Sequence, residues 1–386
     1  MNRNLIIGVD LNKEDPQVCY YDTETENTVV ASMKDSVEGV SLQDILDELE
    51  VQSELPEEDT DVDMILDMEQ KASDILRQTL EDQGITDPEL QIEGITVTVP
   101  KLDRHLVELI RFVYEDLGIE SGRGFLQDYK ESFYYHTLYQ KKEYWNRNVG
   151  FFRFDDRQVS FYSLTMNQQT RPITCMVSEG VSITLKEDKS LWDEQFCNMI
   201  NASLRQNIYS CIFIMGETFS GSWGKRSVPL LCKGGRKVFM VDNLFARGAC
   251  YAARERVLER RLGDYLYLGD DLVRNNIGMQ MIVQGNETYY PLISAGVNWY
   301  DTEKTVECLL DDEAALEFVV SAMDSKKQNV LRMELPGMPE RPDRTTRIRL
   351  HLEFESPTRC VVEAEDLGFG DLFPASGQIW REILEG

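Results

Sequence analysis

Residues 330–370 read VLRMELPGMPERPDRTTRIRLHLEFESPTRCVVEAEDLGFG. Runs in this stretch alternate apolar and polar side chains, and a corner rich in proline and glycine at 335–339 joins them. Because successive side chains of a β-strand point to opposite faces of a sheet, this pattern predicts strands with one buried face. The last part of the chain is therefore expected to be a β-domain.

The order of these parts resembles the end of the peptide-binding β-domain of the seventy-kilodalton heat-shock chaperones (the DnaK type). In that family a Leu-x-Gly-hydrophobic-Pro corner leads into an alternating strand pair, as 335–339 (LPGMP) does here. Upstream, 271–278 (DLVRNNIG) is similar to the start of the family's β-domain, and 263–270 (GDYLYLGD) resembles its apolar interdomain linker.

The resemblance implies a domain plan for the whole chain. Residues 1–262 would form an α/β actin-like (ribonuclease H-like) two-lobed nucleotide-binding domain with a reduced insertion subdomain. Residues 263–270 would be the linker, and 271–386 a β-sandwich resembling the chaperone peptide-binding domain. After it we expect one short helix, at 377–385, in place of the family's long helical lid.

The same resemblance assigns candidate site residues. The first strand, 4–10 (NLIIGVD), ends like the opening of the actin-like ATPases. Asp128 falls where the family has a glutamate near the metal, and Asp155 lies in the second phosphate hairpin. If the protein is an ATPase, three carboxylates would be catalytic and would hold Mg²⁺: Asp10, Asp128 and Asp155. Contacts to ATP or ADP would come from Gly8, Asp10, Lys13, Gly216, Glu217 and Gly248.

Several phosphate-binding features of the family are missing. The family follows its first aspartate with Leu-Gly-Thr-Thr, whereas this chain has LNKEDP at 11–16. The turn within 153–163 has no glycine, and only Gly216 remains of a glycine pair. Glycine readily adopts the positive φ angles that let backbone amides surround a phosphate. The interval 35–87, where the family carries its catalytic lysine, is short and acidic, with room for one or two helices.

Three hypotheses follow. The first is a chaperone-like protein whose nucleotide-binding domain is degenerate, acting as a peptide- or protein-binding scaffold without efficient ATP hydrolysis. The second is a divergent ATPase chaperone that retains weak turnover of ATP with Mg²⁺. The third, an actin-like assembly protein or metabolic kinase, is disfavoured by the C-terminal β-domain. The loss of glycine from two phosphate loops favours the first hypothesis.

Composition limits the partners further. The chain has 68 acidic and 40 basic residues and a formal net charge of −28, which repels nucleic acids and anionic lipid but is compatible with basic proteins. We expect a protein or peptide partner, no nucleic acid, no membrane association and a cytoplasmic location, since the sequence has neither an apolar run of about 20 residues nor a signal-peptide pattern. The oligomeric state is left open.

Cysteine and histidine give no sign of a metal site or a catalytic triad. The eight cysteines are scattered, with no C-x-x-C pair, which predicts reduced, mostly buried thiols. The three histidines, His105, His136 and His351, have no ligand spacing between them. A structural or surface role is predicted for each of them.

Overall fold

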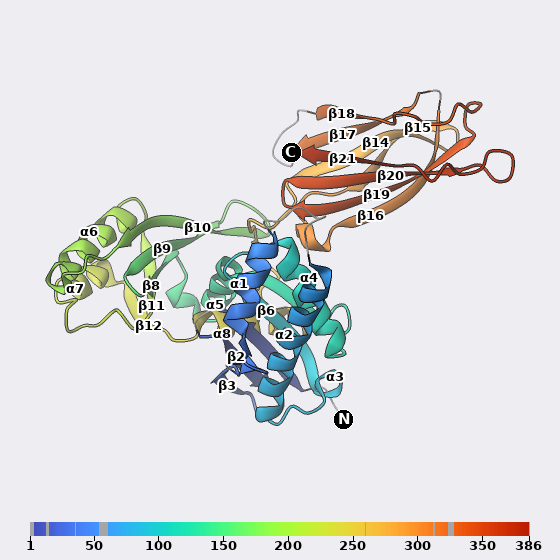
Figure 1. Cartoon of the computed structure of the whole chain (residues 1–386). Helices are drawn as coiled ribbons and strands as arrows, with labels where there is room; N and C mark the ends of the chain where they lie inside the picture. Colours follow the sequence, from blue (N-terminus) through green and yellow to red (C-terminus); the bar gives the residue numbers. More distant parts are fainter. Residues whose placement is uncertain are drawn as a thin grey trace. The chain divides into compact units, whose positions relative to one another are not determined.

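The computed structural model describes residues 4–12, 15–34, 36–53, 61–258, 260–311, 313–322 and 328–385 (Figure 1). The chain forms two compact units, Met1–Gly269 (unit 1) and Asp270–Gly386 (unit 2). The segment 263–270, predicted as a linker, contains strand β13 (Tyr265–Tyr267), which pairs in parallel with β10 (Ile173–Thr184). These residues therefore contribute to a sheet of unit 1.

The first sheet of unit 1 has the strand order β3-β2-β1-β6-β7. Strands β1, β2 and β3 are antiparallel, whereas β6 and β7 run parallel to β1. Their bounds are β1 (Leu5–Asp10), β2 (Gln17–Asp22), β3 (Asn27–Ser32), β6 (Ile92–Val99) and β7 (Gly124–Asp128). The central strands β1 and β6 are buried along nearly their whole length, as expected for strands covered on both faces.

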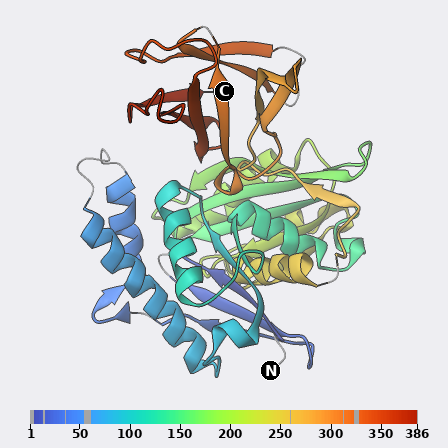
Figure 2. The ribbon, with the colours of Figure 1, turned by 90° about the vertical axis from the view of Figure 1, so that its right-hand side faces the viewer.

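Helices cover both faces of this sheet (Figure 2). One face packs against α8 (Leu244–Val257), and the other against α4 (Arg104–Asp116), where Tyr114 donates a hydrogen bond to Phe125 O of β7. The interval predicted to hold one or two helices contains α1 (Leu42–Ser53) and α2 (Val62–Asp82), which pack against α4. Three short elements accompany them: β4 (Ser36–Val37), β5 (Val40–Ser41) and α3 (Pro88–Gln91).

The second sheet has the order β12-β11-β8-β9-β10-β13. Strands β8, β9 and β10 are antiparallel, and β11 and β12 run parallel to β8. The bounds not yet given are β8 (Asn148–Asp155), β9 (Gln158–Asn167), β11 (Tyr209–Met215) and β12 (Lys237–Met240). Counted along the chain, the first sheet has the order 3-2-1-4-5, and the second has the same order and strand directions with one further strand, β13, beside its third strand. This duplication confirms the predicted two-lobed actin-like plan for unit 1.

Two helices lie between the lobes. Helix α5 (Tyr129–Leu138) contacts α8, and both supply apolar side chains to a core on the inner face of the second sheet, among them Phe133 and Phe245. Other α8 side chains, such as Cys250, pack on the first sheet. The opposite face of the second sheet packs on α6 (Trp192–Leu204), beside the short α7 (Ser227–Leu231). Four 3₁₀-helices complete the described elements: η2 (Lys142–Tyr144), η3 (Lys189–Leu191), η4 (Lys233–Gly235) and η5 (Trp299–Asp301).

Unit 2 consists of two four-stranded antiparallel sheets, β15-β14-β17-β18 and β16-β19-β20-β21. A small pocket is lined by Ile277 and Val320 from the first sheet and by Phe354 and Leu384 from the second, so the two sheets face each other. The strands are β14 (Asn275–Val283), β15 (Asn286–Ile293), β16 (Glu303–Leu310), β17 (Ala315–Ala322), β18 (Gln328–Glu334), β19 (Thr346–Ser356), β20 (Arg359–Gly368) and β21 (Ile379–Glu385).

The alternating runs at 330–370 form β18, β19 and β20, and burial alternates regularly along β19. The Pro/Gly corner takes the chain from one sheet to the other, and Gly337 has a φ of +77° there. Glycine adopts this left-handed conformation without the steric cost that a side chain imposes. The strand prediction for this stretch therefore agrees with the structure.

The predicted helix at 377–385 is wrong. These residues form β21, which pairs antiparallel with β20. Trp380 and Leu384 are both buried, and their spacing of four residues suits a helix as well as a strand. The hydrogen-bonding edge of β20 decides between the two, because it pairs the backbone of 379–385 along its length.

No helix in the part of the chain that the structure describes is long and apolar enough to cross a membrane.

Candidate functional site

Asp10, the first predicted catalytic residue, lies at the end of β1 and is only 5% exposed. Its carboxylate accepts a hydrogen bond of 2.6 Å from the Tyr129 hydroxyl. Burial raises the pKa of Asp10 to about 7, although the bond from Tyr129 and the charge of Arg153 act in the opposite direction. The residue that would face nucleotide and metal is thus covered by a protein side chain.

Tyr129 is held in place by two neighbours, Phe245 of α8 and Arg153 of β8. Its ring stacks on Phe245 with ring centroids 3.7 Å apart and an angle of 7° between the planes. The Arg153 guanidinium lies 5.3 Å from the Tyr129 ring centroid and 5.6 Å from that of Phe245. Stacked rings with an adjacent cation form a favourable arrangement, so this cluster closes the space beside Asp10.

Asp155 lies near the same cluster. Its carboxylate is 3.1 Å from Arg153 and the side chain is 45% exposed. The β8–β9 hairpin turns at Asp156 and Arg157, since Asp155 pairs with Gln158. The segment 153–163, which resembles a phosphate hairpin in position, thus forms a two-strand turn without glycine.

Asp128 has a different environment. It is the N-cap residue of α5, and its side chain accepts a 2.7 Å hydrogen bond from the backbone N–H of Glu131. A capping carboxylate satisfies a helix donor that would otherwise lack a partner. Asp128 is 8% exposed, so its local role is to start α5.

The three aspartates do not form a metal cluster. Among the described residues, no group of three or more His, Cys, Asp or Glu side chains is placed to hold a metal ion. The structure brings Asp10 and Asp155 close to Arg153. A cation of the protein therefore stands beside these two carboxylates, where the resemblance would place Mg²⁺.

Protein atoms pack closely against the three glycines predicted to contact nucleotide, Gly8, Gly216 and Gly248. A Cβ atom on Gly8 would lie 2.2 Å from the backbone N of Cys250, and one on Gly248 would lie 2.1 Å from Ser132 O. On Gly216, which has a φ of +115°, it would lie 2.1 Å from Phe154 O. The side-chain direction of each glycine is therefore filled by protein backbone, so these positions are glycine for close packing.

Two predicted nucleotide contacts remain. Glu217 is exposed after the end of β11, where its charge would repel an anionic ligand. Lys13 lies outside the described residues. Of the predicted catalytic residues, Asp10 is hydrogen-bonded by Tyr129 and Asp155 is paired with Arg153.

Sequence reasoning identified Asp10 but missed Tyr129, Arg153 and Phe245 as the residues that cover it. Part of the signal is visible in the sequence. Arg153 and Asp155 are two positions apart on β8 and therefore share a face of that strand. The contact between Asp10 and Tyr129 has no such signal, since 119 residues separate them.

The wild-type protein is expected to lose stability as the pH rises toward 7, because Asp10 becomes charged while buried. Asp10→Asn should abolish this loss. The ordinary pKa of this group is 3.8, whereas its pKa in the folded protein is about 7. The folded state thus binds more protons between these values, and the stability present at low pH is lost as the pH rises toward 7. Between about pH 5 and about pH 7 the loss is about 2 kcal/mol. Urea titrations of both proteins at these two pH values measure it.

The quantity to compare is the difference in the free energy of unfolding between wild type and Asp10→Asn, because other groups titrate equally in both proteins. This difference is predicted to change with pH. A constant difference would show that Asp10 ionises as easily in the folded chain as in the unfolded one.

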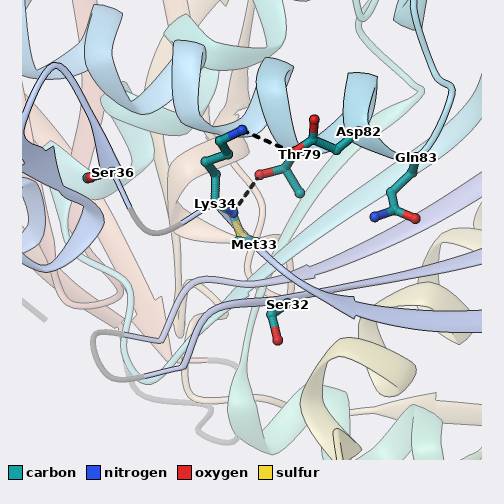
Figure 3. Close-up of a pocket in the computed structure, with 7 residues that line it drawn as sticks. All are labelled: Ser32, Met33, Lys34, Ser36, Thr79, Asp82 and Gln83. Carbon is teal, nitrogen blue, oxygen red and sulfur yellow. Dashed lines mark hydrogen bonds and ion pairs between the residues drawn. The ribbon is translucent and has the colours of Figure 1, made fainter.

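A second polar region lies beside α2. A pocket with a volume of about 370 Å³ is lined by seven residues: Ser32, Met33, Lys34, Ser36, Thr79, Asp82 and Gln83 (Figure 3). Lys34 Nζ lies 3.1 Å from Asp82, and the Lys34 backbone N–H donates to Thr79 Oγ1 at 2.9 Å. Since these polar groups pair with one another, the pocket shows no arrangement that suits catalysis.

Three solved structures with similar folds are distant from this chain. A Bacteroides thetaiotaomicron protein with an actin-like ATPase fold and unknown function is 7% identical, with a TM-score of 0.34, over 64% of this chain and 96% of its own. Leishmania braziliensis glucokinase is 10% identical, with a TM-score of 0.37, over 66% and 93%. The ethanolamine utilization protein EutJ from Carboxydothermus hydrogenoformans is 11% identical, with a TM-score of 0.35, over 65% and 90%.

Because all three TM-scores are below 0.5, the fold assignment of unit 1 rests on the strand order of its two sheets. None of the three is described as a heat-shock chaperone. No curated protein matches the sequence.

Two family models match the sequence itself. A domain of unknown function (DUF8552) matches residues 272–385, which correspond to unit 2. Residues 30–270, more than half of the chain, match the model described as family of unknown function (DUF5716) C-terminal. The chain therefore belongs to the DUF5716 family.

Proposed function

We propose that this protein is a chaperone-like scaffold in which unit 1 keeps a two-lobed actin-like fold without efficient ATP hydrolysis. Its function would be to bind a protein or peptide partner. The observation that carries the proposal is the 2.6 Å hydrogen bond from Tyr129 to the buried Asp10. In support, a protein side chain hydrogen-bonds the carboxylate that the resemblance assigns to metal and nucleotide.

The electrostatics of the cluster support this function. Phosphoryl transfer depends on positioning the phosphates and neutralising their charge, usually with Mg²⁺ and a basic side chain. Here Arg153 pairs with Asp155 and lies over Tyr129. Its charge already offsets the acidic residues of the site, so the cluster is stable without a ligand.

The partner-binding part of the proposal concerns unit 2. Its sheet orders leave β21 at an edge, and Ile379 and Ile383 on that strand are 63% and 38% exposed. An extended segment can add to such an edge through backbone hydrogen bonds while its side chains contact exposed apolar residues. The net charge of −28 favours a partner with basic character.

The test is calorimetric titration of the nucleotide-stripped protein with ATP and ADP, with and without Mg²⁺. We expect no saturable heat up to about 1 mM nucleotide, which corresponds to a binding free energy weaker than about 4 kcal/mol. A thermal melt at the same concentrations should show no shift in the unfolding midpoint. Basic, extended peptides titrated into the same preparation test the partner-binding part.

Micromolar nucleotide binding that Asp10→Ala abolishes would instead support the alternative, a divergent ATPase. A Glu287→Gln variant serves as a control, because Glu287 is acidic and exposed and lies on β15 of unit 2. Binding that depends on Mg²⁺ and on Asp10 but not on Glu287 would overturn the scaffold proposal.

A further inference from the structure

A pocket with a volume of about 340 Å³ lies at the edge strand β12, away from the cluster around Asp10. It is lined by residues of α5, β11, β12 and α8, which are labelled in Figure 1, and by Tyr144 of η2. Binding sites for small molecules usually have volumes of roughly 300–1,000 Å³. This pocket therefore has room for a molecule of one or two rings.

The walls of the pocket are mainly aromatic. Phe239 of β12 lies 4.9 Å from Tyr144 and 6.0 Å from Phe213, measured between ring centroids. His136 of α5 meets Phe213 edge to face at 5.3 Å. Phe213 is 3% exposed, and Phe239 and Tyr144 are partly buried. Aromatic faces and edges arranged in this way favour contact with another planar ring.

Polar side chains also line the pocket, among them His136, Gln140, Asp242 and Arg247. His136 is 5% exposed, and its Nδ1 has no hydrogen-bond partner in the described part of the chain. Burial lowers the pKa of His136 to about 3, and the nearby charge of Arg247 acts in the same direction. The imidazole is therefore neutral at physiological pH, with one donor and one acceptor nitrogen.

Arg247 of α8 supplies the positive charge of the pocket. Its side chain hydrogen-bonds Tyr251, which also lines the pocket, and it has no carboxylate within 4.0 Å among the described residues, although Asp242 is on the same lining. A guanidinium without a carboxylate partner offers a planar, forked set of donors that matches a carboxylate. The pocket thus combines an apolar aromatic body with one anion-binding group.

We propose that this pocket binds a small aromatic carboxylate, with its ring packed against the aromatic pair Phe239 and Tyr144 and its carboxylate on Arg247. The neutral imidazole of His136, which also lines the pocket, contributes a hydrogen-bonding nitrogen. Asp242 lies on the same lining and disfavours ligands of higher negative charge. The site is separate from the scaffold function proposed above and does not depend on it.

The experiment uses the full chain and a panel of sodium salts: benzoate, phenylacetate and indole-3-acetate. Ligand-observed NMR and calorimetry should give saturable binding with a Kd below about 1 mM for at least one of them. Cyclohexanecarboxylate, which keeps the charge without the aromatic ring, should bind more weakly. Phenethylamine, which keeps the ring with the opposite charge, should show no saturable binding.

Variants locate the binding. Arg247→Gln should weaken the aromatic carboxylate about tenfold or more, because a charge-assisted pair is lost. Arg254→Gln is the matched control on the same helix, since Arg254 lies over Tyr21 and does not line the pocket. Asp242→Asn should leave the affinity unchanged or raise it. Because His136 stays neutral, the affinity should be constant between about pH 5 and about pH 8.

Two results would overturn the proposal. One is the absence of saturable binding by every aromatic carboxylate of the panel in the folded wild-type protein. The other is binding that Arg247→Gln and Arg254→Gln change equally. If Arg247→Gln lowers the unfolding midpoint, Phe239→Leu is used as the test variant instead. Binding of the aromatic carboxylate with wild-type affinity by folded Phe239→Leu would also overturn the proposal.

Discussion

Replacing Arg341 with methionine is expected to lower the free energy of unfolding of unit 2 by about 3–5 kcal/mol. Arg341 and Asp366 form a bidentate pair of 2.6 and 2.8 Å, and their side chains are 5% and 0% exposed. Asp366 also accepts hydrogen bonds from the backbone N–H groups of Gly368 and Ser376. Without Arg341, a buried carboxylate would keep its charge without a cationic partner.

The contribution of this pair to the free energy of unfolding depends on pH with the opposite sign to that of Asp10. The Arg341 guanidinium holds the pKa of Asp366 below its ordinary value. The stabilisation is therefore complete above the ordinary aspartate pKa of about 4 and is lost as the pH falls through the lower pKa of the folded protein. Measurements at neutral pH report the full effect of the substitution.

Urea titration of the full chain labelled with 5-fluorotryptophan measures this loss. The ¹⁹F signals of Trp299 and Trp380 report on unit 2 separately from the three tryptophans of unit 1. Arg347→Met is the control, because Arg347 is half-exposed and lies 3.6 Å from the exposed Glu307. Its cost should be at most about 1 kcal/mol. Equal losses from the two substitutions would contradict a special role for the buried pair.

The second large effect is expected from alanine at Gly8 or at Gly248. A Cβ atom at either position would overlap backbone atoms at 2.1 to 2.3 Å. Backbone cannot move aside as a flexible side chain can, so β1 and α8, or α5 and α8, would have to separate. We expect each substitution to cost about 3 kcal/mol or more, even though alanine favours a helix over glycine by about 1 kcal/mol at Gly248.

The measurement is the urea midpoint of unit 1, followed through Trp145 in the core between the lobes. Gly221→Ala is the control, since a Cβ atom there would have no neighbour within 4 Å, and its effect should be within about 0.5 kcal/mol. The losses at Gly8 and Gly248 should be the same with and without ATP. Stable variants at both positions would show that these glycines are not needed for packing.

The sequence alone predicted structural features that depend only on residues close together in the sequence. Alternation along 346–356 identified β19, because the side chains of a strand change face at every residue. The turn after Asp155 was predicted for a similar reason, since it depends on the few residues that form it. The resemblance of short motifs to the heat-shock chaperones implied the two-lobed plan of unit 1, which the duplicated strand order bears out.

Other features were decided by contacts between distant parts of the chain. Residues 379–385 have a spacing that fits a helix, yet the edge of β20 makes them a strand. Gly8 and Gly248 match a nucleotide-binding pattern in sequence, and only the packing of α8 on β1 and α5 shows what surrounds them. The hydroxyl of Tyr129 reaches Asp10 across 119 residues. The sequence could place a carboxylate at the end of the first strand, but its burial and its partner depend on how the two lobes pack, because solvation and hydrogen bonding are properties of the assembled structure.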